Sequence, residues 1–452
     1  MSEPVSLAQM LDAREKRVFR QQQILKQYNV PVISFTMNIA GPVKNSPLIL
    51  RGFEEGQRML KEQFLAAKIK PLFEETVCAD TGNEAFYAID RPALEIKRLT
   101  AAIEDGVPVG RLFDMDIIKT DGSKVDRSEI GLPDRKCIIC GRRAAECARN
   151  RAHSVEELQK KTNEILKKHL EENYSRRIAE LASRSILYEV CTTPKPGLVD
   201  CADNGSHKDM DIFTFMSSAS ALWPYFQDAC LIGMRTADQD PDKTFSELRR
   251  RGRLAEGSML SATGGVNTHK GAVFSVGLCC AALGRLYAAQ HLDTAMILDE
   301  CAAMTRGLTG SDYKDLTEEN AKTAGEILFV KHKIAGVRGE AEKGFPIVKN
   351  VGFPVLMNGL SSGLSLNEAG CAALLAVIAE GVDTNVIARG GLEIQKQISA
   401  EIAELLKKDP YPERSVLEDL NRRFVNLNLS PGGSADIIAM CYFLYFLQSE
   451  AD

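Results

Sequence analysis

Hydrophobic and polar positions in the first third of the chain follow two different periods. Apolar side chains spaced as on one face of a helix predict helices at residues 14–28, 51–68 and 91–104. Short runs rich in β-branched and aromatic residues predict strands at residues 31–39 and 73–78. A further strand, a tight turn and a return strand are predicted at residues 110–120, 121–122 and 123–127. This mixture of periods predicts an α+β domain.

A change of pattern near residue 170 divides the chain. Residues 154–175 predict a long polar helix, and Ser154 and Glu157 have the spacing of a capping box. Beyond it, strand-like runs are scarce and helices are predicted at residues 176–190, 211–230, 270–289, 293–307, 318–328, 367–380, 391–407, 415–424 and 434–448. We therefore expect two domains, a mixed α+β domain at residues 1–170 and an all-α helical domain at residues 171–452.

The composition fits two ordinary globular domains. Of the 452 residues, 44% are apolar and 26% are charged, which excludes a collagen-like, coiled-coil or disordered chain. The formal charge of −5 is uneven, because residues 1–170 carry 28 basic and 24 acidic side chains and the remainder has a net charge of −9. This basic excess does not indicate nucleic acid, since a phosphorylated metabolite also needs local positive charge.

Three features bear on the cellular compartment. The longest apolar run, residues 271–284, is shorter than the roughly 20 residues that span a membrane. Residues 1–20 are charged and lack the apolar core of a signal peptide. The 12 cysteines are scattered without the rhythm of a disulfide scaffold. We expect a cytoplasmic protein that binds no membrane and whose cysteines are mostly reduced.

The end of the strand predicted at residues 31–39 carries a first chemical motif. Asn38, Gly41 and Lys44 lie together in the sequence there. A glycine lets backbone N–H groups approach an anion, and a lysine adds a positive charge. A strand-to-loop turn that ends in a solvated lysine is the commoner interpretation of such a sequence.

The strand predicted at residues 110–120 carries a pair of acids. Alternation puts Asp114 and Asp116 on one face, opposite Phe113 and Met115. Adjacent carboxylates repel each other unless a cation lies between them, and Mg²⁺ is commonly held by one or two carboxylates and substrate phosphates. A half-solvated strand with an acidic outer face fits these residues equally well.

Residues 135–153 combine basic side chains with metal-ligand types. Six lysines and arginines accompany one acid, Glu146, and we expect some of the arginines to contact phosphate. The same segment holds four residues of the types that bind tetrahedral Zn²⁺, namely Cys137, Cys140, Cys147 and His153. Their middle spacing is shorter than in common zinc modules. Cysteines packed on a helix with a solvated arginine face are therefore slightly favoured over zinc.

Two neighbouring segments of the second domain carry charged groups in turns. Prolines on both sides of Lys195 stiffen its position, and Asp200 follows closely. The next segment holds His207, Asp209 and Asp211. If this segment opens a helix, His207 and Asp211 share one face, and acids are favourable at a helix N-terminus.

Two glycine-containing segments complete the candidate set. A glycine-rich loop leading into a helix, a layout that binds phosphates, holds Gly264, Gly265, Asn267, His269 and Lys270. Its spacing excludes a Walker loop and a dinucleotide fingerprint. Arg389 and Gly390 precede another predicted helix. A lone histidine is usually structural, but two in polar turns with acids and lysines favour a site in this domain.

These motifs together resemble two known enzyme families. Residues 1 to about 170, through the motifs at 38–44, 110–116 and 135–153, resemble apo-citrate lyase phosphoribosyl-dephospho-CoA transferase. The remainder, through the motifs at 193–200, 205–211, 264–271 and 389–391, resembles triphosphoribosyl-dephospho-CoA synthase. The whole chain resembles a fused, bifunctional form. Ala40 stands where the family pattern has proline, and Ile394 where it has glycine.

The resemblance implies a bifunctional transferase. The second domain would join ATP and 3′-dephospho-CoA and release adenine. The first domain would transfer phosphoribosyl-dephospho-CoA to a serine of the apo acyl carrier subunit of citrate lyase and release diphosphate. ATP, 3′-dephospho-CoA and the carrier subunit are the implied partners, and Mg²⁺ is expected with the triphosphate.

The resemblance also implies roles for the candidate residues. Loss of adenine needs a carboxylate near the anomeric carbon, a base and a proton donor, for which the candidates are Asp200, His207, Asp209, Asp211 and His269. Candidates for holding the triphosphate are Lys195, Gly264, Gly265, Asn267, Lys270, Arg389 and Gly390. In the first domain Asp114 and Asp116 would hold Mg²⁺. The candidate phosphate contacts there are Asn38, Gly41, Lys44, Arg135 and Arg142.

Two other functions fit parts of the sequence. A metal-dependent phosphohydrolase with an all-α core would bind its metal through His207, Asp209 and Asp211, although it lacks an adjacent His-Asp pair. A non-enzymatic, nucleotide-binding regulator would use the cysteines and His153 as a zinc module. The first predicts phosphate release without a CoA acceptor, and the second predicts bound zinc without turnover.

Overall fold

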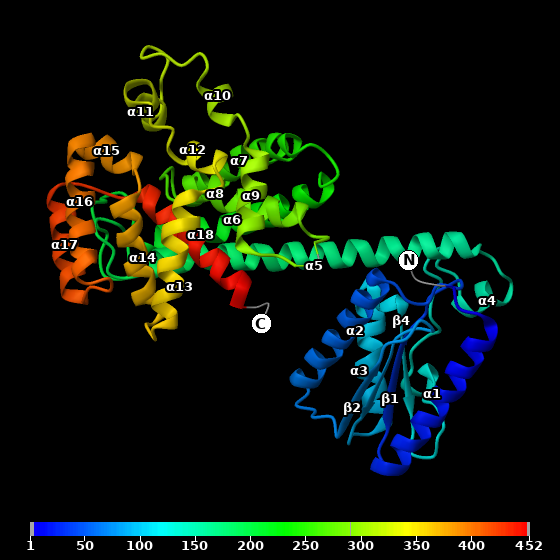
Figure 1. Cartoon of the computed structure of the whole chain (residues 1–452). Coiled ribbons are helices and arrows are strands. Elements are labelled where there is room, and N and C mark those ends of the chain that lie inside the picture. Colours follow the sequence, from blue (N-terminus) through cyan, green and yellow to red (C-terminus); the bar gives the residue numbers. More distant parts are fainter. Residues whose placement is uncertain (1–3, 290, 450–452) are drawn as a thin grey trace. The chain divides into compact units, whose positions relative to one another are not determined.

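The computed structural model describes residues 4–289 and 291–449, and the chain divides into two compact units (Figure 1). Unit 1 is Met1–Asn173 and unit 2 is Tyr174–Asp452, a division a few residues beyond the predicted boundary. Helix α5 (Val155–Cys191) passes through the division. The prediction of two separate helices here was wrong, because no glycine or proline interrupts the sequence between them. Ser154 and Glu157 do form the predicted capping box.

Unit 1 is built on a four-stranded antiparallel sheet. The strands are β1 (Val32–Met37), β2 (Phe73–Val77), β3 (Glu84–Ala88) and β4 (Phe113–Ile118), in the order β2-β3-β1-β4. Strand β3 is absent from the prediction. The predicted return strand after β4 was wrong, because only Lys124 bridges back to Ile118 and a 3₁₀ turn, η2 (Arg127–Ile130), follows. Asp126 caps that turn and ends the extended chain.

Helices cover both faces of this sheet. They are α1 (Leu7–Tyr28), α2 (Pro47–Ala66), α3 (Ala93–Gly106), the 3₁₀ turn η1 (Pro108–Leu112) and the short α4 (Ala144–Arg149). On one face Phe35 of β1 stacks on Phe53 of α2, with ring centroids 4.7 Å apart. On the other face Ile24 of α1 is buried against strand residues such as Val32. The mixed α+β class predicted for this part of the chain is confirmed.

Unit 2 is mostly helical, as predicted, and its described residues include no strand. Its helices after α5 are α6 (Ile212–Arg235), α7 (Pro241–Ala262), α8 (Lys270–Arg285), α9 (Thr294–Met304), α10 (Leu308–Tyr313), α11 (Ala324–His332), α12 (Gly336–Glu342), the π-helical turn η3 (Val348–Gly352), α13 (Phe353–Ser361), α14 (Leu366–Glu380), α15 (Thr384–Gly390), α16 (Leu392–Lys408), α17 (Arg414–Asn426) and α18 (Gly432–Ser449). Helix α7 and the short helices α10, α12, α13 and α15 are absent from the prediction. The helix expected from residue 318 begins instead at Ala324, because Thr323 caps it.

The core of unit 2 surrounds α8, α14 and α18. Their small side chains, such as Ala281, Ala373 and Ala439, are almost completely buried, so the helices approach closely. Across the part of the chain that the structure describes, no single helix has the length and apolar character to cross a membrane. The pair α14 and α15, bent by 65°, meets those two requirements only together.

Candidate active sites

A cavity of about 160 Å³ in unit 1 brings together predicted residues from two motifs. Its lining includes Asn38, Lys44 and Asp114, with Arg14 and Arg17 of α1. The backbone N–H of Asn38 donates to Leu112 O at 2.8 Å, which ties the end of β1 to the start of β4. The first two motifs of the sequence therefore meet at one edge of the sheet.

The acid pair of β4 lies as the alternation predicts. Asp114 and Asp116 are half-buried, whereas Phe113 and Met115 are fully buried on the opposite face. Burial and the neighbouring Asp116 raise the pKa of Asp114, and Arg135, 3.9 Å away, opposes that rise. A carboxylate pair with too little compensating charge fits a divalent cation. The Asp116 Oδ2 atom meanwhile accepts a hydrogen bond from Lys124 Nζ.

The loop at residues 38–44 is fixed by its packing. Gly41 has a φ of +82°, and a Cβ there would lie 2.4 Å from Gln159 Nε2 of α5, so both conformation and space require glycine. Gln159 also donates to Ala40 O at 3.3 Å. Lys44 Nζ donates to Ile39 O, and burial with the nearby Arg14 lowers the pKa of Lys44. Lys44 thus lines the cavity from a fixed loop.

The two arginines predicted to contact phosphate lie in different places. Arg135 donates to Gly110 O and Arg111 O at 3.2 Å, next to Asp114, and its Nε is buried without a hydrogen-bond partner in the described part of the chain. Arg142 lies instead beside Cys140, which raises the pKa of this guanidinium. Arg135 is therefore beside the cavity's Asp114, and Arg142 is beside a cysteine cluster.

Sequence reasoning missed the cations of α1. Arg14 and Arg17 line the cavity together with Met10, and Arg17 Nε donates to Glu84 Oε1 at 2.7 Å. The sequence did contain a signal that these cations lie together, because positions 10, 14 and 17 share one face of a helix. Nothing in the sequence, however, says which strand end that face covers.

In unit 2 the last turn of α5 and the loop after it hold an enclosed lysine and two enclosed acids. Glu189, Lys195 and Asp200 are each at most 5% exposed. Lys195 Nζ pairs with the Glu189 carboxylate and donates to Glu189 O at 2.7 Å. Asp200 accepts backbone N–H groups from Lys195, Ala202 and Asp203, at 2.6–3.1 Å. Lys195 therefore compensates the charge of the buried Glu189, and Asp200 holds the backbone turn at residues 195–203.

A second enclosed group lies at the N-terminus of α8. His269 is 3% exposed, its Nδ1 is 2.7 Å from Ser218 Oγ, and its Nε2 has no partner among residues 4–289 and 291–449. Burial, assisted by Lys195, lowers the pKa of His269 to about 3, so the imidazole is neutral at pH 7. The Asp436 carboxylate lies against Gly271, where a Cβ would be 1.7 Å from Asp436 Oδ2.

Three acids that the sequence analysis did not select belong to this region, namely Glu189, Asp383 and Asp436. Asp383 Oδ2 accepts from Ser434 N at 2.7 Å and Ser434 Oγ at 2.9 Å. Burial raises the pKa of all three acids, and Glu189 and Asp383 raise that of Asp436 further. One signal was available, because Asp436 is the only charged residue of α18.

The expected helix face shared by His207 and Asp211 does not exist. Helix α6 begins at Ile212, and Asp211 is its N-cap, whose Oδ1 accepts from Thr214 N at 2.8 Å. His207 lies in the loop before it. The prediction was wrong because an aspartate that caps a helix ends the preceding loop and does not extend the helix backwards.

His207 and Asp209 form a second, more open group with Arg389. The Nδ1 atom of His207 is 3.9 Å from Asp209 Oδ1, and its Nε2 is 2.8 Å from Ser430 Oγ. Burial and Arg389 lower the pKa of His207. Arg389 Nη1 donates to Ser206 O at 3.2 Å, so two of the predicted segments meet here.

The glycine-rich loop runs into α8, as predicted. Gly264 and Gly265 have φ values of +67° and +95°, and a Cβ would meet nothing within 4 Å. The backbone conformation, not crowding, therefore requires glycine. The side chains of Asn267 and Lys270 are exposed, and Lys270 Nζ lies 3.2 Å from Glu256 Oε2. Gly390 differs, because a Cβ there would lie 2.7 Å from Leu429 Cδ2.

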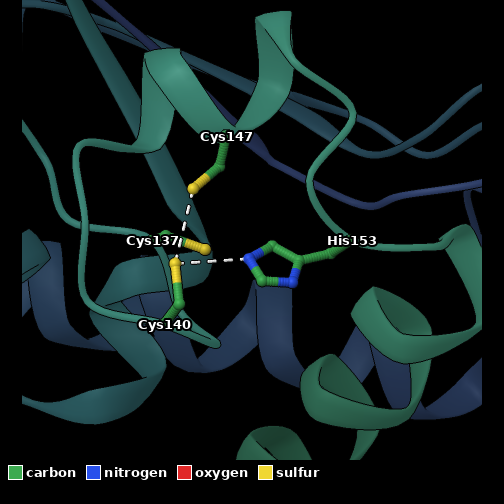
Figure 2. A group of neighbouring side chains, drawn as sticks. All are labelled: Cys137, Cys140, Cys147 and His153. Carbon is green, nitrogen blue, oxygen red and sulfur yellow. Dashed lines mark hydrogen bonds between the residues drawn. The ribbon is translucent and has the colours of Figure 1, made fainter.

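Unit 1 also holds a group of four potential metal ligands, which we call the Cys/His cluster: Cys137, Cys140, Cys147 and His153 (Figure 2). The side chains converge from the loop before α4, from α4 itself and from the loop before α5. All twelve cysteines of the chain are free thiols. Within the described residues this is the one group of at least three His, Cys, Asp or Glu side chains with metal-binding geometry.

Two family models match the chain in succession. Residues 5–169 match the family described as apo-citrate lyase phosphoribosyl-dephospho-CoA transferase, and residues 175–452 match ATP:dephospho-CoA triphosphoribosyl transferase. The gap between the two matches falls at the division between the units. Each unit therefore corresponds to one family.

Two similar proteins match nearly the whole of this chain, and a third matches part of it. Protein CitXG of Haemophilus influenzae is 35% identical over 97% of this chain and 96% of its own length. Protein CitXG of Leuconostoc mesenteroides subsp. cremoris is also 35% identical, over 98% and 97%. A 2-(5″-triphosphoribosyl)-3′-dephosphocoenzyme-A synthase of Pectobacterium atrosepticum is 38% identical over 60% of this chain and 90% of its own length. The chain belongs to the family of fused CitX–CitG proteins.

Proposed function

We propose that the chain makes and attaches the prosthetic group of citrate lyase in two successive transferase reactions. Unit 2 joins ATP and 3′-dephospho-CoA to give 2′-(5″-triphosphoribosyl)-3′-dephospho-CoA and adenine. Unit 1 transfers the phosphoribosyl-dephospho-CoA group to a serine of the apo acyl carrier subunit and releases diphosphate. The observation that carries this proposal is the pair of family matches, which follow one another over residues 5–169 and 175–452.

In unit 2 the 2′-hydroxyl of dephospho-CoA would attack C1′ of the ATP ribose. The C1′–N9 bond breaks, the hydroxyl loses its proton and the leaving adenine gains one. His207 is the best-placed base, because it is half-buried, its pKa is lowered and it faces Asp209. His269 is neutral too, but its enclosure suits a supporting role.

The enclosed charges of unit 2 would act by positioning. Asp200 accepts from Lys195 N in the loop after α5, Lys195 Nζ pairs with Glu189 at the end of α5, and Asp383 bonds to Ser434 at the start of α18. These contacts would fix the loop at residues 195–203 and the start of α18, on either side of the segments that carry His207 and its partner Ser430. The triphosphate would contact the exposed Gly264, Gly265, Asn267 and Lys270 at the N-terminus of α8.

In unit 1 the carrier serine would attack the α-phosphorus of the triphosphoribosyl group. The bond from that phosphorus to the bridging oxygen breaks, and diphosphate leaves in line with the attack. Asp114, whose pKa is raised, would accept the hydroxyl proton. Lys44, Arg14 and Arg17 would neutralise the phosphates in the cavity. Asp114 and Asp116 would hold Mg²⁺, which supplies further charge neutralisation.

The proposed partners are small phosphorylated molecules and one protein. ATP and 3′-dephospho-CoA would bind unit 2, and the apo acyl carrier subunit would present its serine to unit 1. We expect no nucleic acid or membrane partner. A cytoplasmic setting suits a chain whose twelve cysteines are all free.

Mass spectrometry of the full chain with ATP, 3′-dephospho-CoA and Mg²⁺ tests the first reaction. Free adenine and triphosphoribosylated dephospho-CoA are expected. Addition of the apo carrier subunit should then increase the mass of the carrier and release diphosphate. ADP or free phosphate without adenine would contradict the synthase and favour a phosphohydrolase.

A further inference from the structure

The Cys/His cluster has the dimensions of one metal coordination sphere. Cys140 Sγ lies 3.4 Å from Cys147 Sγ and 3.3 Å from His153 Nε2, and all four ligand atoms lie within 4.8 Å of one another (Figure 2). With zinc–sulfur bonds of about 2.3 Å, neighbouring ligands of a tetrahedral zinc lie about 3.8 Å apart. The four side chains therefore need only small shifts to bind one ion.

The backbone around Cys137 and Cys140 is arranged to bring both sulfurs to one point. The N–H of Ile139 donates to Cys137 Sγ at 3.5 Å, and the N–H of Gly141 donates to Cys137 O at 3.1 Å. Gly141 has a φ of +72°, which a residue with a side chain rarely adopts. This turn, unlike a helix, presents two thiols on one side, and its N–H group stabilises a thiolate.

The environment of the cluster differs from that of a hydrophobic core. Cysteines such as Cys230, Cys279 and Cys441 are buried in the core of unit 2 and pack there as small apolar side chains. In the cluster Cys140 is exposed and Cys137 is half-buried, so apolar packing does not explain why three cysteines meet. A disulfide does not explain it either, since the sulfurs of Cys140 and Cys147 are 3.4 Å apart.

The local charge also suits a metal–thiolate centre. Three thiolates and a neutral imidazole around Zn²⁺ carry a net charge of −1. Residues 135–153 contain six lysines and arginines and one acid, and the Arg142 guanidinium lies beside Cys140. Such a basic surrounding stabilises a negatively charged centre.

We propose that the Cys/His cluster binds one structural zinc ion. Four protein ligands complete a tetrahedron and leave no position for substrate, which is the arrangement of structural sites. The ion fixes the segment that holds Arg135 next to Asp114, because Arg111 donates to Lys136 O and Ala144 N donates to Arg135 O. The sequence spacing slightly favours cysteines packed on a helix without a metal. The spatial arrangement of the four side chains favours zinc.

Metal analysis of the full chain, purified from zinc-supplemented cells with a thiol reductant and no chelator, tests the site. About one zinc per chain is expected. The variant Cys140→Ser should lose at least about tenfold in zinc content, because it removes one of four ligands. Cys78→Ser is the matched control, since Cys78 is an exposed thiol of the same unit outside the cluster, and it should keep its zinc.

Cobalt exchange keeps the test independent of how the variant folds. Unmodified protein loaded with Co²⁺ should show the intense visible bands of tetrahedral cobalt and a thiolate-to-cobalt charge-transfer band. Wild-type protein with neither zinc nor this spectrum would overturn the proposal. So would a Cys140→Ser variant with unchanged zinc, or a Cys140–Cys147 disulfide in the purified chain.

Removal of the metal tests the structural role. After chelation, removal of the chelator and restoration of Mg²⁺, hydrogen exchange in residues 135–153 should increase and loading of the carrier subunit should decrease, while adenine release by unit 2 is unchanged. If removal of zinc left hydrogen exchange in residues 135–153 unchanged, the ion would not fix this segment.

Discussion

The two candidate sites hold their charged residues in opposite ways. In unit 1 the acids of β4 are half-buried, and cations from α1 and the loop at residues 38–44 line an open cavity. In unit 2 Lys195, Asp200 and His269 are each at most 3% exposed. Asp200 accepts from Lys195 N in its own loop, Lys195 Nζ pairs with Glu189 of α5, and His269 contacts Ser218 of α6. One site leaves its charges available to phosphates, and the other uses many of its charges to build the site.

This difference separates catalytic from positioning roles. A half-exposed carboxylate such as Asp114 can exchange its partners when a substrate or a cation binds, and its loss should affect chemistry alone. A buried pair such as Lys195 and Glu189 has already lost its water, so the loss of one partner should affect stability first. The same chemical groups therefore predict different phenotypes in the two units.

The largest expected effect is on transfer to the carrier. Asp114→Asn should lower carrier loading by about a hundredfold to ten-thousandfold, because it removes the proposed base and an Mg²⁺ ligand. Adenine release should be unchanged. Mass spectrometry of both products measures the two steps in one sample. Asp121→Asn, an exposed acid in the turn after β4, is the control and should keep both activities. Loss of both activities in a folded Asp114→Asn variant would contradict two separate sites.

The second expected effect is on the stability of unit 2. Lys195→Met leaves Glu189 buried without its cation and should destabilise unit 2 by about 3–5 kcal/mol. Urea unfolding followed by tryptophan fluorescence reports this unit selectively, because Trp223 of α6 is the only tryptophan of the chain. Lys396→Met, which breaks an exposed pair with Glu393, should change stability by less than about 1 kcal/mol. Equal effects of the two variants would show that the buried Lys195–Glu189 pair does not stabilise unit 2 more than an exposed pair does.

The local patterns in the sequence were sufficient for the acid pair of unit 1 but not for every element. Alternation along β4 depends only on neighbouring residues, so the common face of Asp114 and Asp116 was predicted correctly. Strand β3 was missed because its sequence, Glu84–Ala88, includes two alanines and an acid, which are depleted in strands. Helix α7 was missed because its polar sequence lacks a broad apolar stripe.

The meeting of the enclosed acids of unit 2 could not be predicted from local patterns. Glu189 ends a long helix, Asp383 caps α15 and Asp436 lies in α18, so their meeting depends on how three distant helices pack. The Cys/His cluster shows the same limit. Its ligand types were evident, but only the turn at Gly141 shows that they converge. The roles proposed for the candidate site residues stay predictions.

A third prediction concerns a buried acid of unit 1 away from its cavity. Glu55 of α2 is 2.9 Å from His169 Nε2 and 2.6 Å from Asn173 Nδ2, and Arg58 Nε donates to it at 2.7 Å. Burial raises its pKa, but the hydrogen bonds from Arg58 and His169 outweigh burial and bring the pKa to about 2. Glu55→Gln should therefore destabilise unit 1 by about 1–3 kcal/mol at pH 7.

The stability difference between wild type and Glu55→Gln should depend on pH in one direction only. Because folding lowers the pKa of Glu55 from 4.5 to about 2, its contribution is complete above pH 4.5 and is lost as the pH falls towards 2. Hydrogen exchange of peptides from α2 should show the gap between wild type and Glu55→Gln narrowing below pH 4.5. A gap that stays constant as the pH falls from 4.5 towards 2 would mean that the charge does not stabilise unit 1. Glu62→Gln, an exposed partner of Arg58, is the control.

The smallest expected effect concerns Lys124, the exposed lysine beside the acid pair of unit 1. Lys124 pairs with Asp116 and lowers the pKa of Asp114, so Lys124→Met should raise that pKa and shift the acid limb of the carrier-loading rate to higher pH. The shift should be less than about one pH unit, because the Lys124 side chain is 61% exposed and solvent screens its charge. Lys119→Met, which breaks a neighbouring pair with Glu129, should leave the profile unchanged. Identical profiles for wild type and Lys124→Met would show that another group than Asp114 sets the acid limb.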